Sequence, residues 1–452
     1  MKDMKSIKLI TVLFGVFCFQ MFGQSYSLKQ AIEYAKQNNS NIKIANLNFD
    51  VSDKKVKETI GSGLPQLDFT GSLEDNLKIQ TQLLPGVMFG SSEELIPVKF
   101  GTKYNLSAGL QLTQKIFDYS FWVGIDAAKL NTRLSEQKLQ KIEEEIIYNG
   151  AIAYYNALVI QKQFENLKAI LAASEQTLKS TELKYQNGMT KKIDVDKIKV
   201  SFNNTISQTQ QAELNYKQAL NNLKYEMGMP VDSTITLSDS ISENIRGLFF
   251  DALQTNNTVY ENRIDYQILK TNRGLYESEK SNNIAAFFPT LSFSADYSYQ
   301  AQCSKFNFFA SDKDWFNSSS IGLTLKVPIF SGFQNYAKVE QSDLNIKIAE
   351  ENLKLAEQSI KVELSNYEIQ YRSALDNIRN EKENLDLAES VFRNTQLEFK
   401  QGAGSSLDLV QAESSLRETQ NNFYTKLLGL CVAGLDLEKS KGTLNNFYNN
   451  LK

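Results

Sequence analysis

Residues 64–226 of this chain correspond, feature by feature and in the same order, to residues 288–440. In each copy a proline opens one segment of alternating hydrophobicity, and an Ile-Phe pair closes a second one. An internal duplication restricts the architecture before any single residue is interpreted, because both copies have to fold alike. We therefore expect each half to contain two strands, a very long helix, a turn and a returning helix. The markers are Pro65 and Ile116-Phe117 in the first copy, and Pro289 and Ile329-Phe330 in the second.

Each copy also contains a second shared motif. An aromatic residue is followed by a glycine three positions later, and an aspartate between two aliphatic residues follows the glycine at the sixth position. A glycine between two long periodic segments is typical of a tight turn. The motif therefore predicts that the chain reverses here and continues as a returning helix. It consists of Tyr185, Gly188 and Ile193-Asp194-Val195 in the first copy, and of Phe399, Gly402 and Leu407-Asp408-Leu409 in the second.

The overall composition argues against several classes of protein. A formal net charge of −3 over 452 residues provides no basic excess for binding nucleic acid. The chain has no histidine, which removes the usual general base and the commonest metal ligand. We therefore expect no enzyme active site, no metal and no cofactor.

The N-terminus has the layout of a secretory signal peptide. Three lysines precede an apolar run at residues 9–19, which is shorter than a membrane-spanning helix requires. We expect residues 1–24 to be this signal. Cys18 is a poor match to a lipidation site, because Phe17 stands where a small residue is needed.

Four segments alternate apolar and polar side chains over about ten residues each, the length that a tilted strand needs to cross a bilayer. This pattern alone also fits an amphipathic sheet in a soluble protein. Two observations favour the membrane. Loops of roughly 24 and 18 residues, at 80–103 and 301–318, join the strands in pairs, and they are longer than ordinary hairpin turns. Four strands are also too few to close a barrel, and lipid does not tolerate an open sheet edge, so we expect several chains to share one barrel. The apolar faces are Leu67, Phe69 and Leu73; Tyr104, Leu106, Ala108, Leu110 and Leu112; Leu291, Phe293, Ala295, Tyr297 and Tyr299; and Ile321, Leu323, Leu325 and Val327.

Two segments, 119–187 and 332–401, contain no proline and almost no turn signal. As helices they extend about 100 Å at 1.5 Å per residue. Apolar side chains spaced seven apart predict that each helix forms a coiled coil. A soluble coiled-coil rod is the alternative, but it does not explain the strands. The seam positions are Gly150, Ala157, Phe164, Leu171, Leu178 and Tyr185 in the first copy, and Leu364, Tyr371, Ile378, Leu385, Phe392 and Phe399 in the second.

Shorter helices complete the expected layout. A capping box at Ser27 and Gln30 predicts a first helix that runs to about Ile60. We expect a first repeat at 25–240 and a second repeat at 241–452 that ends in a C-terminal tail. The remaining expected elements are strands at about 64–79, 103–117, 288–301 and 318–330, and returning helices at 191–226 and 406–433.

Together these motifs resemble the TolC family of outer-membrane efflux proteins, and the duplication covers most of the chain. The resemblance implies a mixed α/β membrane protein: a homotrimer whose four strands per chain form a twelve-stranded β-barrel in the outer membrane, joined to a long α-helical coiled-coil tunnel in the periplasm. It implies the exit duct of a tripartite efflux or type I secretion system. A periplasmic adaptor protein and an inner-membrane pump are the implied partners, and the duct itself transports passively.

The resemblance also implies a gate at the tunnel entrance. Asp408 matches the first of two aspartates that ring the entrance in the family, while Gln411 stands at the second position. Asp194 and Phe399 match two further gate residues. The alternative for both aspartates is capping, because each lies at the start of a returning helix, where a carboxylate meets the positive end of the helix dipole.

Other positions at the tips depart from the family or allow two interpretations. Gly404 stands where an arginine helps to hold the family gate shut, and Ile193 replaces the threonine partner of that arginine. Four tip residues are candidate adaptor contacts. The alternative for the glycines is a turn that requires positive φ, and for the lysines a solvated charge. These residues are Gly188, Gly402, Lys191 and Lys192.

A different class of function remains as the alternative. A surface coiled-coil adhesin or a structural envelope protein needs only the long helices, and it leaves the duplicated strand pairs unexplained. Within the export interpretation, the sequence does not distinguish drug, metal and protein cargo, because the pump and the adaptor select the cargo.

Overall fold

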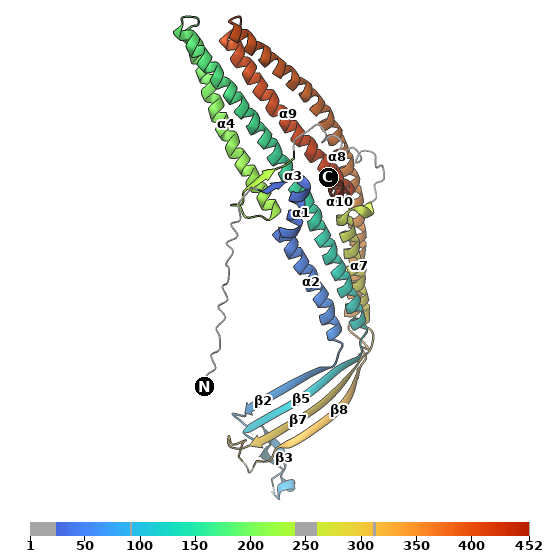
Figure 1. The fold of residues 1–452 in the computed structure, drawn as a ribbon. Helices are drawn as coiled ribbons and strands as arrows, with labels where there is room; N and C mark the ends of the chain where they lie inside the picture. Colours follow the sequence, from blue (N-terminus) through green and yellow to red (C-terminus); the bar gives the residue numbers. More distant parts are fainter. Residues whose placement is uncertain (1–23, 91–92, 240–259, 311–312, 452) are drawn as a thin grey trace, which may run out of the picture. The chain divides into compact units, whose positions relative to one another are not determined.

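The computed structural model describes residues 24–90, 93–239, 260–310 and 313–451 (Figure 1). Residues 1–23 of the expected signal peptide, and the expected boundary between the repeats at 240 and 241, lie outside these ranges. The chain divides into two compact units, and each unit contains stretches from both copies of the duplication. One unit comprises residues 1–43, 142–259 and 361–452, and the other comprises residues 44–141 and 260–360.

The duplication is visible in the lengths of the helices. The two long helices, α3 (Tyr119–Gln186) and α8 (Gln334–Gln401), have 68 residues each. The two returning helices, α4 (Lys192–Met227) and α9 (Ser406–Lys441), have 36 residues each. Glycines at residues 228 and 442 end the returning helices with φ of 70° and 71°, a left-handed conformation that glycine adopts without strain. The helix α9 therefore runs to Lys441, beyond the expected end at 433.

The prediction of one continuous helix to about Ile60 is wrong, because the structure has two helices with a break between them. They are α1 (Leu28–Asn38) and α2 (Ser40–Gly61). The capping box at Ser27 and Gln30 is confirmed. The break lies at Asn39, whose ψ of 132° is extended and whose side-chain amide donates to the Glu226 carbonyl at 2.7 Å. A contact with the end of α4, more than 180 residues away, thus ends α1.

The core of the helical unit lies where α1, α3, α4, α8 and α9 meet. Tyr154 is fully buried there, and its hydroxyl donates to the Tyr26 carbonyl at 2.9 Å. The strand β1 (Gln24–Tyr26) pairs in parallel with β6 (Ile235–Leu237). A short last helix, α10 (Leu444–Asn450), packs on this core through Leu444 and Phe447.

The heptad seam of the second copy is confirmed along most of its length, because Tyr371, Ile378, Leu385 and Phe399 are all buried. In the first copy, the prediction that the seam includes Tyr185 as its last position is wrong. Tyr185 is 45 % exposed, although its counterpart Phe399 is 9 % exposed. The two tips therefore pack differently despite their shared motif.

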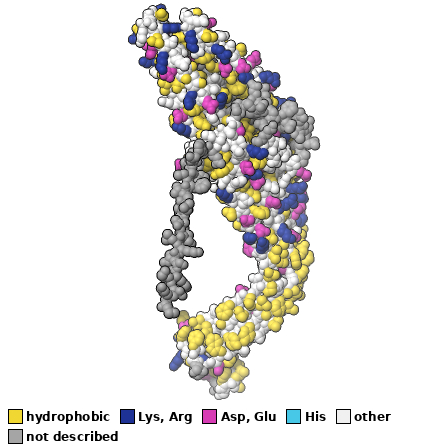
Figure 2. Space-filling model, viewed as in Figure 1, with side chains coloured by type: hydrophobic (Ala, Val, Ile, Leu, Met, Phe, Trp, Pro, Cys, Tyr) yellow, Lys and Arg dark blue, Asp and Glu magenta, His cyan; other side chains and the backbone are white. Residues whose placement is uncertain are grey.

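The second unit contains one antiparallel sheet of four strands in the order β2-β5-β7-β8. Its register places the predicted apolar positions opposite one another: Phe69 lies opposite Leu110, and Leu110 lies opposite Tyr297. The predicted apolar residues therefore share one face, and Figure 2 shows hydrophobic side chains gathered over the sheet. The strands are β2 (Gln66–Asp75), β5 (Tyr104–Phe117), β7 (Thr290–Cys303) and β8 (Phe316–Lys326).

Three features of this unit differ from the expectation. The strand β8 ends at Lys326, so Ile329-Phe330 lies beyond it, because Pro328 has no N–H for the ladder. The loop at 80–103 contains a small hairpin of β3 (Thr81–Pro85) and β4 (Leu95–Lys99) around a 3-10 turn, η1 (Gly86–Phe89). The second copy also has a helix before its first strand, α7 (Ile264–Ala285), after a short 3-10 turn, η2 (Tyr260–Asn262). Among the described helices, none has an apolar stretch long enough to cross a membrane.

Candidate functional site at the helix tips

The two chain reversals predicted from the sequence lie between α3 and α4 and between α8 and α9. Gly188 has φ of 70° and Gly402 has φ of 82°, which is the left-handed region. Both glycines are exposed, and a Cβ added to either one meets no atom within 4 Å. The requirement for glycine is therefore conformational, since there is space for a side chain but strain in the backbone.

Asp194 connects the two tips. One of its carboxylate oxygens accepts a hydrogen bond from the Ser406 hydroxyl at 2.6 Å, and the other accepts from the Thr190 hydroxyl at 3.3 Å. The bond from Ser406, which is the largest cause, lowers the pKa of Asp194 below its usual value. Asp194 is not the N-cap of α4, because that position belongs to Lys191, which makes no side-chain capping bond. The carboxylate thus joins the start of α4 to the start of α9.

Phe399 lies in a small core at the tips. It packs with Leu178 and Val195 of the first copy and with Leu409 of α9. Lys184 holds this ring in place from α3: its ammonium lies 5.4 Å from the ring centroid and donates to the carbonyls of residues 399 and 400 at 3.1 Å. An aromatic residue at this position is therefore part of the contact between hairpins.

The remaining predicted gate residues lie apart from this contact. Asp408 and Gln411 are both exposed on α9, and within the described part of the chain the Asp408 carboxylate has no side-chain partner. Ser405 is the N-cap of α9, since its hydroxyl accepts from the backbone N–H groups of Leu407 and Asp408. The residue that caps α9 is thus Ser405 and not Asp408. Lys191 and Lys192 are exposed at the first tip.

Gly404 stands in a tight turn. Its N–H donates to the Glu398 carbonyl at 3.1 Å, and a Cβ added to it lies 3.0 Å from the Phe399 nitrogen. A side chain at this position therefore crowds the backbone of the turn, which has to give by a few tenths of an ångström to admit it.

A buried polar cluster, which the sequence patterns do not predict, lies further along the same helices. Glu413 is 6 % exposed, and its carboxylate accepts from the Ser174 hydroxyl of α3 at 3.0 Å. Arg417 lies 3.3 Å from the same carboxylate and donates to the Thr205 oxygen of α4 at 2.6 Å. We call Ser174, Thr205, Glu413 and Arg417 the polar quartet. Its only trace in the sequence is the Glu-Arg spacing of four residues, which is common on helix surfaces.

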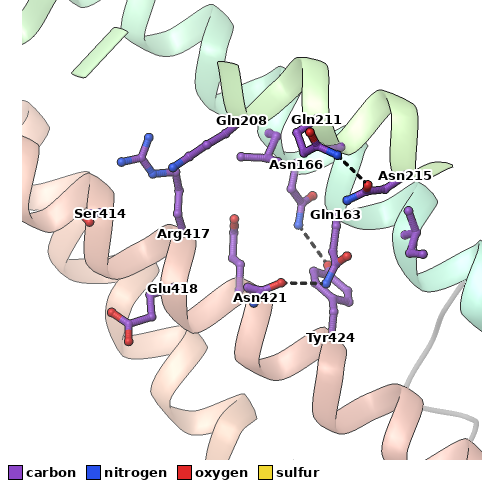
Figure 3. Close-up of a pocket in the computed structure, with 14 residues that line it drawn as sticks. Gln163, Asn166, Gln208, Gln211, Asn215, Ser414, Arg417, Glu418, Asn421 and Tyr424 are labelled. Carbon is purple, nitrogen blue, oxygen red and sulfur yellow. Dashed lines mark hydrogen bonds between the residues drawn. The ribbon is translucent and has the colours of Figure 1, made fainter. Parts of the chain in front are cut away.

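Beside the quartet lies a pocket of about 410 Å³ between α3, α4 and α9. Figure 3 shows that side-chain amides from all three helices point into it. Gln163 donates to Asn421 at 3.0 Å and Asn166 donates to the Tyr424 hydroxyl at 3.1 Å, so the pocket is bridged from α3 to α9. The amide residues that line it are Gln163, Asn166, Gln208, Gln211, Asn215, Gln420 and Asn421. Across the described ranges, the structure has no group of three side chains suited to hold a metal ion.

Comparisons with known proteins place this geometry in a family. The model of the family described as outer membrane efflux protein matches residues 31–228 and 277–439. Outer membrane protein TolC of Vibrio cholerae is 22% identical over 346 residues, which are 75% of this chain and 77% of that protein. Outer membrane protein TolC of Escherichia coli is 21% identical over an alignment of 457 positions, which covers 97% of this chain and 87% of that protein.

A solved structure agrees with these matches. The CmeC outer membrane channel of Campylobacter jejuni superposes with a TM-score of 0.69 at 16% sequence identity, covering 94% of this chain and 90% of that one. This likeness confirms the expected fold class, a strand domain joined to a long helical tunnel. The family match and the relatives described above confirm the expected outer-membrane location and the export function. Because the family model matches both halves of the duplication, this chain belongs to the outer membrane efflux protein family and is a transport channel rather than an enzyme.

Proposed function

We propose that three copies of this chain form the outer-membrane exit duct of a tripartite efflux or type I secretion system. A periplasmic adaptor protein then joins the duct to an inner-membrane pump, and cargo passes through without chemical change. The four-stranded sheet is the observation that carries this proposal. Its apolar face is exposed in the single chain, with Phe69 at 71 %, Ile321 at 80 % and Leu323 at 69 %.

The edges of the sheet support an assembly of several chains. The outer strands β2 and β8 each lack a partner on one side within the described sheet. Unpaired backbone groups are not tolerated in lipid, so β8 of one copy has to pair with β2 of the next. Two copies give eight strands, and side chains fill the interior of a barrel of that size. Three copies give twelve, which leaves room for a duct.

The tips support the proposed gate. Asp408 and Gln411 are exposed near the end of the helical unit, where three copies converge in a tapering tunnel. Three Asp408 carboxylates form a ring of negative potential that attracts cations. Asp194 and Phe399 contribute by holding the two hairpins of one chain together. Because Gln411 is neutral, the proposed ring has one aspartate per chain, which is half the charge of a ring with two aspartates per chain.

The tip turns support the proposed adaptor contact. Gly188 and Gly402 are exposed with open space around them, so the backbone of another protein is able to approach closely. Lys191 and Lys192 add positive charge beside the first turn. An adaptor surface with acidic groups and an accessible backbone fits these features.

The oligomeric state tests the proposal. The purified protein, cross-linked through its lysines in detergent, is expected to run as three chains on a denaturing gel. A sample unfolded in dodecyl sulphate before cross-linking serves as the control and is expected to stay monomeric. Recovery of the chain as a stable monomer from the soluble periplasm would contradict the proposed duct.

A further inference from the structure

The internal duplication allows the contact between neighbouring copies to be derived from the contact within one chain. The helices α4 and α9 have the same length, 36 residues, and begin at residues 192 and 406. Each residue of α4 therefore has a counterpart 214 positions later in α9, since 406 − 192 = 214. Asp194 corresponds to Asp408, and Ser406 corresponds to Lys192.

Within one chain, the two helices use different faces to meet each other. The α4 face is buried in this contact and includes Ser201 and Thr205, at 5 % and 0 % exposure. The α9 face is equally buried and includes Ser406 and Glu413, at 3 % and 6 %. Asp194 and Ser406 join the two faces at the tips through the 2.6 Å hydrogen bond.

The counterparts of these two faces are open. Asp408 and Ser415 of α9, which correspond to Asp194 and Ser201, are exposed. Lys192 and Lys199 of α4, which correspond to Ser406 and Glu413, are exposed as well. Each chain therefore has one exposed face on α4 and one exposed face on α9 that correspond to the two faces already in contact within the chain. A head-to-tail contact with two such complementary faces closes into a ring when it is repeated by rotation.

Charge complementarity indicates how the open faces pair. The open α4 face has lysines at residues 192 and 199, and the open α9 face has Asp408 at the position that faces Lys192 by the internal correspondence. We propose that Asp408 of each copy forms an ion pair with Lys192 of the neighbouring copy when the tips of the copies meet, and that the three carboxylates act as a negatively charged ring when these pairs separate. This pair is the counterpart between chains of the hydrogen bond between Ser406 and Asp194 within a chain. The inference rests on the proposed trimer and names residues that hold it together at the tips.

The contact between copies lacks one feature of the contact within a chain. The counterparts of Glu413 and Arg417 are Lys199 and Asn203, and the counterpart of Ser174 in the same numbering is Ala388. No equivalent of the polar quartet is therefore available between chains. The exposed ion pair at residues 192 and 408 is the specific polar link that remains there, and such pairs are weak and sensitive to salt.

Pairs of introduced cysteines test this arrangement. In the variant with both Lys192→Cys and Asp408→Cys, oxidation by copper phenanthroline or a short bis-maleimide is expected to join chains into covalent dimers and trimers. The matched control has Asp194→Cys and Ser406→Cys, and it is expected to change the mobility of the monomer without joining chains. The native Cys303 and Cys431 are buried and contribute little background.

Charge reversal provides the second measurement. Lys192→Asp and Asp408→Lys are each expected to lower the temperature at which the trimer dissociates on a dodecyl sulphate gel, and the double reversal is expected to restore it. Lys191→Asp reverses the charge of the neighbouring lysine and serves as the control. Adding Asp408→Lys to this variant is expected to leave the dissociation temperature of the trimer lowered. If lysine cross-linking still gives trimers while the cysteine pair yields only monomers and the double reversal restores nothing, the ion pair is wrong and the duct stands. If no trimer forms in the native protein, the duct itself is wrong.

Discussion

Asp194 and Asp408 occupy the same position in the duplicated motif, yet their surroundings differ. The Asp194 carboxylate accepts hydrogen bonds from Ser406 and Thr190, whereas the Asp408 carboxylate faces solvent in the single chain. The difference arises because only one of the two faces is covered within a chain. At the scale of single residues, the same position in the two copies of the motif therefore has two different sets of contacts.

The lowered pKa of Asp194 predicts a pH dependence of the tip. Because its pKa in the folded state lies below the unfolded value of about 3.9, the stabilisation is complete above that value and is lost as the pH falls through the folded pKa. Asp194→Asn is expected to reduce the loss of stability on acidification below about pH 4. Thermal unfolding of both proteins in detergent at several pH values measures this. Equal losses in the two proteins would show that the bond to Ser406 does not shift the titration.

Substitution of Asp408 separates charge from structure. Asp408→Asn is expected to lower the cation preference of the channel and to weaken block by multivalent cations, because three negative charges leave the ring. Ser405 still caps α9, so the helix is retained. Conductance of single channels in a planar bilayer measures the effect, with Asp196→Asn, an exposed aspartate on α4, as a control. Unchanged ion selectivity would remove Asp408 from the gate.

The tip glycines give a prediction about the backbone. Gly402→Val places a β-branched residue at φ of 82°, where strain costs on the order of 1–3 kcal/mol. We expect faster proteolysis of the second tip and weaker export. Gly404→Ala is the control, because it adds a side chain to a crowded position of the same turn that has no positive φ. Wild-type export together with wild-type protease resistance in Gly402→Val would show that the left-handed turn is dispensable.

At the scale of helices, the contact between the first hairpin and α9 is polar as well as apolar. The polar quartet and the amide-lined pocket lie along the same three helices, and the small tip core around Phe399 lies at their end. Buried polar groups that are all paired fix one register between helices, because any slip leaves a charge without its partner. The quartet thus adds a polar constraint on the register between these helices to the packing of the apolar seams.

Removal of one quartet member is expected to be more damaging than removal of two. Arg417→Met leaves Glu413 buried without its cation, and it is expected to destabilise the protein by roughly 3 kcal/mol. The double variant Glu413→Leu with Arg417→Met removes both charges and is expected to recover part of that loss. Denaturant unfolding followed by circular dichroism, arranged as a double-mutant cycle, measures the coupling. A fully additive double variant would mean that the two side chains do not act together.

At the scale of the whole molecule, the duplication accounts for how copies of one chain are able to form the closed wall of the proposed trimer. Each copy of the duplicated segment contributes two strands to the sheet and one hairpin of long helices, so in the proposed trimer the contact between α4 and α9 within a chain has a counterpart between chains, although the polar quartet does not. In the proposed trimer, neighbouring copies cover the outer edges of β2 and β8 and the open faces of α4 and α9, and lipid covers the apolar face of the sheet. Lysine cross-linking in detergent tests the trimer as a whole, and the cysteine pair at residues 192 and 408 tests the contact between the open faces of α4 and α9.

The sequence by itself determined the repeated elements and the sides on which they are apolar. Alternation with period two and seams with period seven are local properties of the chain, so the four strand faces and most seam positions, such as Tyr371 and Ile378, follow from them. The family resemblance follows from motifs whose spacing is also local.

Only the tertiary structure decided which faces meet. Asn39 breaks the first helix because it contacts Glu226, Asp194 is held by Ser406, and Glu413 is buried against Ser174. These partners are about 190 to 240 positions apart in the chain. Periodicity states that a face is apolar or polar, but the choice of its partner depends on how whole helices pack, and that choice made Tyr185 and Phe399 differ despite their shared motif.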